Sequence, residues 1–133
     1  MIVEGISPSD IFQGGIGNCY FLSSISAIAE RPARIQRLLL EEEVSEKGLY
    51  GVCLNINGVW KIYYLDDLIP TSFNRILFSH SASAELWAIL LEKAYAKAYG
   101  GFWNIGTGGF AEDAMKDLTG APTEFIIVKG DED

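Results

Sequence analysis

The chain has 133 residues, enough for one domain with a hydrophobic core, and its 49% apolar and 21% charged residues indicate a folded protein. Its net charge of −8 argues against binding to nucleic acid or to an anionic membrane surface, both of which need a basic face. It contains no run of 18 apolar residues that would predict a transmembrane helix, and its first residues lack the pattern of a signal peptide.

A glycine-rich loop is predicted over residues 1–17, leading into a helix that begins at Cys19. Apolar side chains then recur every three or four positions as far as Ala29, and Pro32 ends or restarts the helix. The positive end of the helix dipole stabilises a thiolate placed there, and a thiolate is the nucleophile of a cysteine protease. The side-chain amide of Gln13, six residues upstream, is a candidate donor to the oxyanion that forms beside the sulfur.

The rest of the chain is predicted to contain a hairpin, three more helices and a last strand. Asn57-Gly58 favours a type I′ turn between the two strands of the hairpin, and Gly100-Gly101 ends the longest helix. The predicted elements are the helix 33–40, the strands 50–56 and 59–65, the helices 85–99 and 111–118, and the strand 123–129. Together they predict an α+β fold with a central helix that starts at the cysteine and a small antiparallel ribbon.

The two cysteines, Cys19 and Cys53, lack CxxC spacing and therefore predict neither a metal site nor a disulfide framework. A reducing, cytoplasmic location fits this usage best. Cys53 is expected to be a small buried residue of a strand.

Four motifs, in order along the chain, resemble those of the calpain family of cysteine proteases. The first runs from Gln13 to Tyr20 and resembles Gln-Gly-x-x-Gly-Asp-Cys-Trp, with Asn18 at the family's Asp and Tyr20 at its Trp. The others are Asp66–Pro70, Glu85–Lys97 and Asp117–Gly120. The resemblance implies that residues 1–133 form the first, largely helical half of a papain-like protease core. The implied activity is calcium-dependent, cysteine-type endopeptidase cleavage of a protein or peptide substrate.

The catalytic partners of the cysteine are expected outside this chain. In papain-like proteases the His and Asn lie about 130–150 residues after the cysteine, and this chain ends at Asp133, short of that distance. His80 is its only histidine, and a surface or capping role is expected for it. We therefore predict that the isolated chain is inactive and that its partner is the second half of the core.

The resemblance also implies a substrate-binding pair and a Ca²⁺ site. The backbone of Gly108 and Gly109 would pair with the substrate peptide as an added strand does. The Ca²⁺ ligands would be the carboxylates of Asp10 and Glu85 and the backbone carbonyls of Val3 and Gly5, which are the hard oxygen donors that Ca²⁺ prefers.

Other interpretations stay open at this level. Gln13 could cap a turn, the glycine pair could be a flexible linker, and Glu85 could be a first-turn glutamate favoured by the helix dipole. The chain could accordingly be a non-proteolytic, calpain-like module that binds calcium or a protein. It could also be a complete small enzyme, a transferase or amidase, that uses Cys19 with His80.

Overall fold

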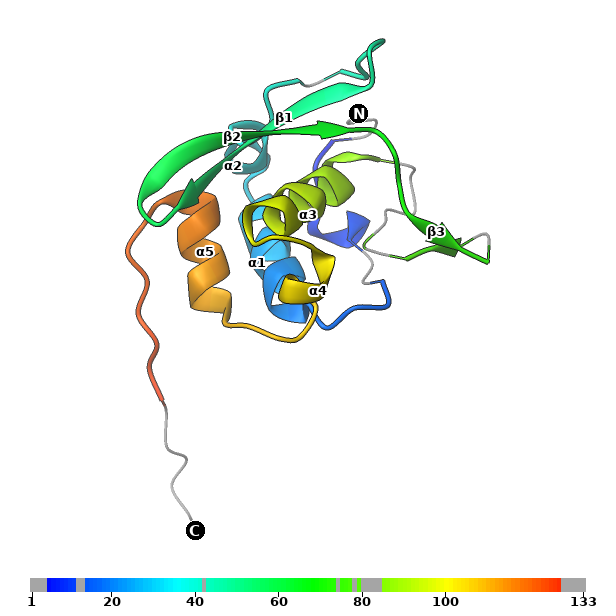
Figure 1. The fold of residues 1–133 in the computed structure, drawn as a ribbon. Helices are drawn as coiled ribbons and strands as arrows, with labels where there is room; N and C mark the ends of the chain where they lie inside the picture. Colours follow the sequence, from blue (N-terminus) through cyan, green and yellow to red (C-terminus); the bar gives the residue numbers. More distant parts are fainter. Residues whose placement is uncertain are drawn as a thin grey trace.

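A computed structural model of the chain describes residues 5–11, 14–41, 43–73, 75–77, 79 and 85–127, and Asp10 in its backbone only. The chain folds as expected into an α+β arrangement, in which a long hairpin arches over a group of helices (Figure 1). The helices are η1 (Pro8–Asp10), α1 (Cys19–Ala29), α2 (Pro32–Gln36), α3 (Trp87–Ala98), α4 (Phe102–Ile105) and α5 (Ala111–Thr119). The strands are β1 (Leu49–Ile56), β2 (Val59–Asp66), β3 (Thr71–Ser72) and β4 (Arg75–Ile76).

The β1–β2 hairpin confirms the predicted ribbon. Its strands pair antiparallel from Leu49 opposite Asp66 to Ile56 opposite Val59. The turn residues Asn57 and Gly58 have φ angles of 53° and 79°, the positive values that a type I′ turn requires. Strand β1 is buried along most of its length, whereas β2 is mostly exposed.

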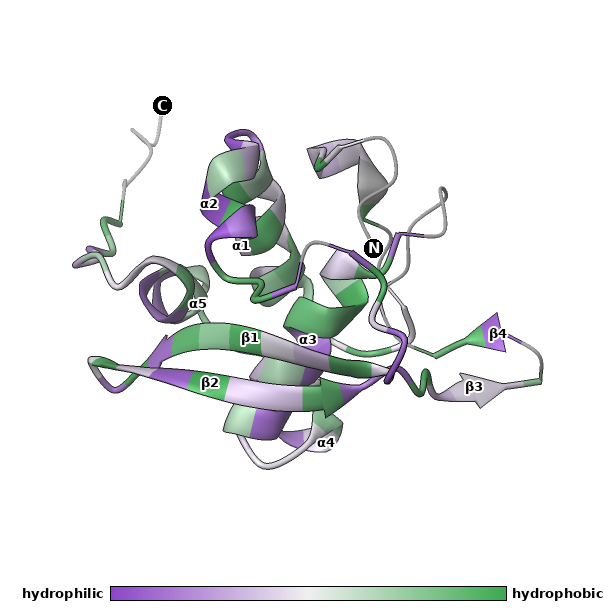
Figure 2. Cartoon of the chain, turned by 90° about the horizontal axis from the view of Figure 1, so that it is seen from above, coloured by the Kyte–Doolittle hydropathy of each residue, from purple (hydrophilic) through white to green (hydrophobic). Residues whose placement is uncertain are grey.

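The core lies between α1, α3 and the inner face of the hairpin. Figure 2 shows hydrophobic residues along β1 and on the helices beneath it, while α5 carries hydrophilic residues on its outer side. Phe21 of α1 stacks on Tyr95 of α3 with 4.2 Å between ring centroids. Aromatic stacking of this kind adds to the stabilisation that burial alone supplies. Helices α1 and α3 are therefore fixed against each other close to the first turn of α1.

Helix α2 is shorter than predicted. It begins at Pro32, the position where proline fits a helix best, but it ends at Gln36 rather than near Leu40. The next residues pair with the free edge of β1: Cys53 N donates to Leu38 O at 2.8 Å, and Leu40 N donates to Gly51 O at 2.9 Å. Tertiary pairing with β1 thus replaces the last turn that the local pattern favours.

The strand predicted over residues 123–129 is wrong for the part that the structure describes. Residues 123–127 are not part of a strand, and they lead away from the helices (Figure 1). Phe125, Ile126 and Ile127 are 64%, 69% and 73% exposed. A β-prone sequence becomes a strand only when its backbone finds a partner, and no such partner lies among the described residues.

Two further differences concern short elements. Helix α4 and the β3–β4 pair were not predicted, because each is too short to show a hydrophobic period. Glu85 lies just before the N-cap of α3, so it is not a residue of the first helical turn.

Within the described residues, no helix combines the length and the apolar character needed to cross a lipid bilayer.

Candidate active site

Cys19 is the first residue of α1, and its side chain is exposed. The carbonyl of Asn18, the N-cap, accepts the backbone N–H groups of Phe21 at 3.0 Å and Leu22 at 3.1 Å. The first N–H groups of a helix have no partner within it, so the backbone N–H of Cys19 points out of the helix end. An exposed thiol therefore stands beside a backbone donor at the positive end of the helix dipole.

The side chain of Asn18 does not cap the helix but enters a buried polar network. Its Nδ2 donates to Glu92 Oε1 of α3, 74 residues further along the chain. Glu92 Oε2 accepts two more hydrogen bonds, from Ser79 N at 2.8 Å and from Ser79 Oγ at 2.6 Å. All three residues are fully buried, so each of these donors depends on the Glu92 carboxylate as its acceptor.

This network fixes Asn18, the residue before Cys19, against α3. Glu92 joins the residue before Cys19 to the segment that precedes α3, and burial raises the pKa of its carboxyl group. Asn18 supplies an amide that donates to Glu92 without carrying a charge of its own. Sequence analysis assigned no role to Glu92. The signal was a glutamate at helical spacing from the buried Ala88 and Tyr95.

The neighbouring Lys93 makes a second connection, on the outside of α3. Its Nζ donates to the backbone carbonyls of Asp66 at 2.7 Å and Leu68 at 2.9 Å, and it forms an ion pair with the Asp66 carboxylate. The hydrogen bond from Lys93 lowers the pKa of Asp66. Two motifs of the sequence, Asp66–Pro70 and Glu85–Lys97, are thereby joined at the end of β2.

The end of α4 and the residue after it lie against the loop and first turn around Cys19. Gly17 N donates to Gly106 O at 3.0 Å, and Tyr20 Oη donates to Ile105 O at 3.2 Å. A Cβ atom on Gly17 would stand 2.7 Å from Gly106 O, so only glycine permits this approach. The two segments border a cavity of about 390 Å³, with Trp103 on its wall and 82% exposed.

Of the predicted substrate-binding glycines, Gly109 contacts the first turn of α1. A Cβ atom on Gly109 would meet the Tyr20 ring at 2.6 Å, which places Gly109 flat against the residue that follows Cys19. Gly108 has a φ of +106°, a conformation that favours glycine, and the space beside its Cα is open. The fold thus brings a glycine backbone next to the first turn of α1 across about 90 residues of sequence.

Several predicted residues lie outside the described part of the chain. Gln13, the oxyanion-hole candidate, is one of them, as are Val3 and His80. The contacts that would test Cys19 with His80 are therefore also outside it. Cys53, expected to be buried, is only half-buried in β1, and burial raises the pKa of its thiol.

The predicted Ca²⁺ ligands are described only in part. Gly5 has a φ of +100°, and Asp10 ends η1. Glu85 is 1% exposed, and its Oε2 accepts a hydrogen bond from Trp87 Nε1 at 3.0 Å. A buried carboxylate of this kind is a hard oxygen ligand and fits the chemistry of Ca²⁺. Among the described side chains, no three from His, Cys, Asp and Glu gather closely enough to hold a metal ion.

Comparison with known proteins assigns the whole chain to one family model, described as calpain family cysteine protease and matched over residues 1–133. Calpain-5 of Caenorhabditis elegans is 36% identical over 137 residues, covering 97% of this chain and 21% of its own length. The calpain-type cysteine protease DEK1 of Arabidopsis thaliana is 39% identical over 125 residues, covering 92% of this chain and 6% of its own. The calpain-1 catalytic subunit of Rattus norvegicus is 35% identical over 128 residues, covering 93% and 18%. The chain spans about a fifth or less of these relatives.

Proposed function

The chain belongs to the calpain family of cysteine proteases, and we propose that it supplies the nucleophile half of an endopeptidase core. The observation that carries this proposal is the exposed Cys19 at the first position of α1, with the residues on both sides of it held in place. Asn18 is hydrogen-bonded to Glu92, and Tyr20 is hydrogen-bonded to Ile105, the last residue of α4. Such preorganisation is what a nucleophile needs, because a misplaced group loses most of its catalytic effect.

The proposed reaction is acyl transfer from a peptide to Cys19. The thiolate attacks the carbonyl carbon of the scissile bond, and the carbonyl oxygen becomes an oxyanion. The backbone N–H of Cys19 and the side-chain amide of Gln13 stabilise that oxyanion by hydrogen bonds. A histidine outside this chain gives its proton to the leaving amine, and water then releases the acyl group. The substrate backbone lies along Gly108 and Gly109.

The proposal has two parts that are tested separately. The chain alone should not digest casein, because it lacks the general base; robust cleavage that is lost on Cys19→Ser would contradict the half-core assignment. In a longer protein that joins this chain to a second half bearing His and Asn, Cys19→Ser should abolish cleavage. Cys53→Ser, the matched control at the other thiol, should leave cleavage unchanged. Equal activity of the Cys19→Ser protein would overturn the assignment of the nucleophile.

Gln13 is tested in that same longer protein. Gln13→Ala should lower kcat by about 10²–10³ because one oxyanion donor is lost. The matched control is Gln36→Ala, an exposed glutamine of α2 at which no change is expected. A normal kcat in Gln13→Ala would mean that the oxyanion is stabilised by other donors. If the parent cleaves nothing, and Cys19→Ser and Gln13→Ala bind Ca²⁺ or a protein partner as well as the parent does, the chain is a non-proteolytic module.

We also propose that Ca²⁺ binds through Asp10, Glu85 and the carbonyls of Val3 and Gly5. The buried carboxylate of Glu85 supports this ligand set, since carboxylate oxygens are hard donors of the kind that Ca²⁺ prefers. Bound Ca²⁺ would tie the loop before Gln13 to the start of α3. Calcium should raise the melting temperature of the parent chain, and Asp10→Ala should abolish that rise while the exposed control Asp67→Ala keeps it. No rise in the parent would refute the site.

A reducing compartment such as the cytoplasm is part of the proposal. Both cysteines are free thiols in the structure, and Cys19 is exposed. An exposed nucleophilic thiol keeps its activity only where it stays reduced.

A further inference from the structure

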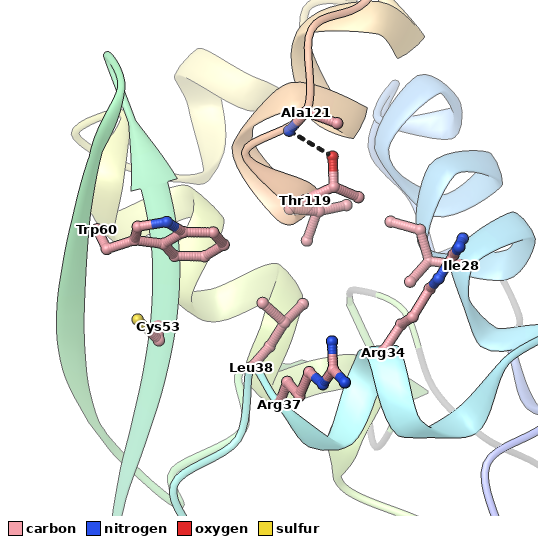
Figure 3. Close-up of a pocket in the computed structure, with 9 residues that line it drawn as sticks. Ile28, Arg34, Arg37, Leu38, Cys53, Trp60, Thr119 and Ala121 are labelled. Atoms are coloured by element: carbon pink, nitrogen blue, oxygen red, sulfur yellow. Dashed lines mark hydrogen bonds between the residues drawn. The ribbon is translucent and has the colours of Figure 1, made fainter.

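A second cavity lies at the opposite end of α1 from Cys19. It has a volume of about 550 Å³ and is bordered by the end of α1, by α2, by the β1–β2 hairpin and by the end of α5 (Figure 3). Ile28, which lines it, is nine residues after Cys19, and this separation corresponds to about 13.5 Å along the helix axis. The volume falls within the range of ligand sites in proteins. The cavity is therefore separate from the proposed active site.

The floor and one wall of the cavity are apolar. Ile28, Leu38 and Leu118 line it while being only 2–3% exposed, so they form a floor set among core residues. Trp60, which is 50% exposed, turns its indole ring along the hairpin side (Figure 3). Burial raises the pKa of the Cys53 thiol in the same wall, so this group is uncharged at neutral pH. An apolar side chain entering the cavity would be covered on several sides.

Two guanidinium groups stand at the rim. Arg34 and Arg37 come from α2 and its C-cap, and their spacing of three residues places them on one side of that helix (Figure 3). Among the described residues, no carboxylate lies within ion-pair distance of either guanidinium group. The ion pair found there joins Lys93 and Asp66. Two like charges held together repel each other. In a chain of net charge −8, this is a local site of unbalanced positive charge.

We propose that this cavity binds a peptide segment of a partner protein in which one aromatic or aliphatic side chain is flanked by Asp or Glu. The apolar side chain would enter above Ile28 and Leu38, and the carboxylates would pair with Arg34 and Arg37. Guanidinium groups suit carboxylates because both are planar and can form two parallel hydrogen bonds. The acidic surroundings oppose longer polyanions such as nucleic acid and anionic membrane surfaces.

The binding test uses the 133-residue chain with Cys19→Ser, which leaves Cys53 as the single thiol. The probe is a fluorescein-labelled peptide with the core Asp-Glu-Phe-Glu-Asp, and the control peptides carry Asn-Gln-Phe-Gln-Asn and Asp-Glu-Ala-Glu-Asp. Fluorescence anisotropy should show saturable binding of the acidic Phe peptide and at least about tenfold weaker binding of both controls. Saturating probe should also slow the alkylation of Cys53 by iodoacetamide, because the occupied cavity covers that thiol.

A pair of double variants assigns the contacts. Arg34→Gln with Arg37→Gln should weaken binding at least about tenfold. Lys47→Gln with Arg75→Gln removes the same charge from exposed sites away from the cavity, and it should change the affinity less than about twofold.

Four results would overturn the proposal: no saturable binding, equal binding of the neutral peptide, unchanged alkylation of Cys53, or equal losses in the two double variants. The peptide comparison and the alkylation of Cys53 are measured with Arg34 and Arg37 unchanged. They therefore test the proposed peptide binding even if a double variant folds poorly. None of these measurements requires peptidase activity, so a failure here is distinguishable from a failure of the proposed endopeptidase function.

Discussion

The two ends of α1 are held by different kinds of interaction. At the Cys19 end, buried hydrogen bonds join separate segments: Asn18 Nδ2 and Ser79 donate to Glu92, and the glycines Gly17 and Gly109 allow neighbouring segments to approach closely. At the Ile28 end, apolar side chains border an open cavity with two arginines at its rim.

The difference follows from what each kind of contact can specify. Hydrogen bonds are directional, and a buried donor that loses its acceptor is costly, so the Cys19 end is confined to one geometry. Apolar contact is non-directional, so the cavity can accept side chains of more than one shape. One end of the helix is suited to hold a reacting group, and the other to receive a partner.

Of the substitutions considered at the Cys19 end of α1, Glu92→Ala should lower the stability of the fold most. It removes the acceptor for three buried donors, and we expect the free energy of unfolding to fall by about 3–5 kcal/mol. Urea denaturation measures the change, with the exposed Glu30→Ala as control. Glu92→Gln keeps an acceptor oxygen for Ser79, and it should recover most of the loss. A loss below about 1 kcal/mol in Glu92→Ala would show that the network does not hold this end together.

Gly109→Ala should have the next largest effect. The added Cβ atom would stand 2.6 Å from the Tyr20 ring, so the ring or the loop must move. Overpacking of this kind costs about 1–3 kcal/mol. Gly15→Ala is the matched control, because its Cβ would lie 3.7 Å from Leu77 O, an ordinary contact. Thermal unfolding of the two variants should therefore differ, and equal melting temperatures would contradict the close packing of Gly109 on Tyr20.

Asn18→Asp should make stability more dependent on pH. In the parent, burial raises the pKa of Glu92 above its ordinary value of 4.5. The stabilising contribution of its protonated form is therefore complete below 4.5 and is lost as the pH rises through the raised value. A second carboxyl group beside Glu92 would strengthen this trend, because two adjacent carboxylates repel each other.

The measurement is the difference in unfolding free energy between Asn18→Asp and the parent at pH 5 and at pH 8. We expect an additional loss of about 1–2 kcal/mol at pH 8. The same difference at both pH values would show that position 18 is not in electrostatic contact with Glu92.

Thr119→Val should have the smallest effect and should stay local to the cavity end. Thr119 Oγ1 donates to Met115 O at 2.6 Å and accepts from Ala121 N at 3.1 Å. Losing these exposed hydrogen bonds should cost about 1 kcal/mol or less. The rate of Cys19 alkylation, followed by mass spectrometry of the modified peptide, should not change. A slower or faster rate would mean that the two ends of α1 are coupled.

Local sequence patterns were sufficient to predict the elements whose signals lie within a few residues of one another. Helices α1, α3 and α5 follow their hydrophobic spacing, and Asn57-Gly58 places the turn of the hairpin where it occurs. The position of Cys19 at the start of α1 was predicted for the same reason. These features depend on residues within a few positions of one another.

The length of α2 and the state of residues 123–127 depended on distant backbone. Residues 38–40 leave the helix because the edge of β1 offers them hydrogen bonds, and residues 123–127 form no strand because no such edge meets them among the described residues. A strand is a property of two segments, and one segment alone does not specify it.

The sequence by itself determined the family motifs, Cys19 as the candidate nucleophile, and the helix that begins at this residue. Only the tertiary structure decided that Glu92 holds Asn18 across 74 residues, that Gly109 lies on Tyr20, and that Arg34 and Arg37 share a cavity with Trp60. The physical reason is that the periodic spacing of apolar residues in a helix is visible within one or two helical turns of sequence. Buried hydrogen bonds and cavities arise where separate elements meet, and their partners are set by packing.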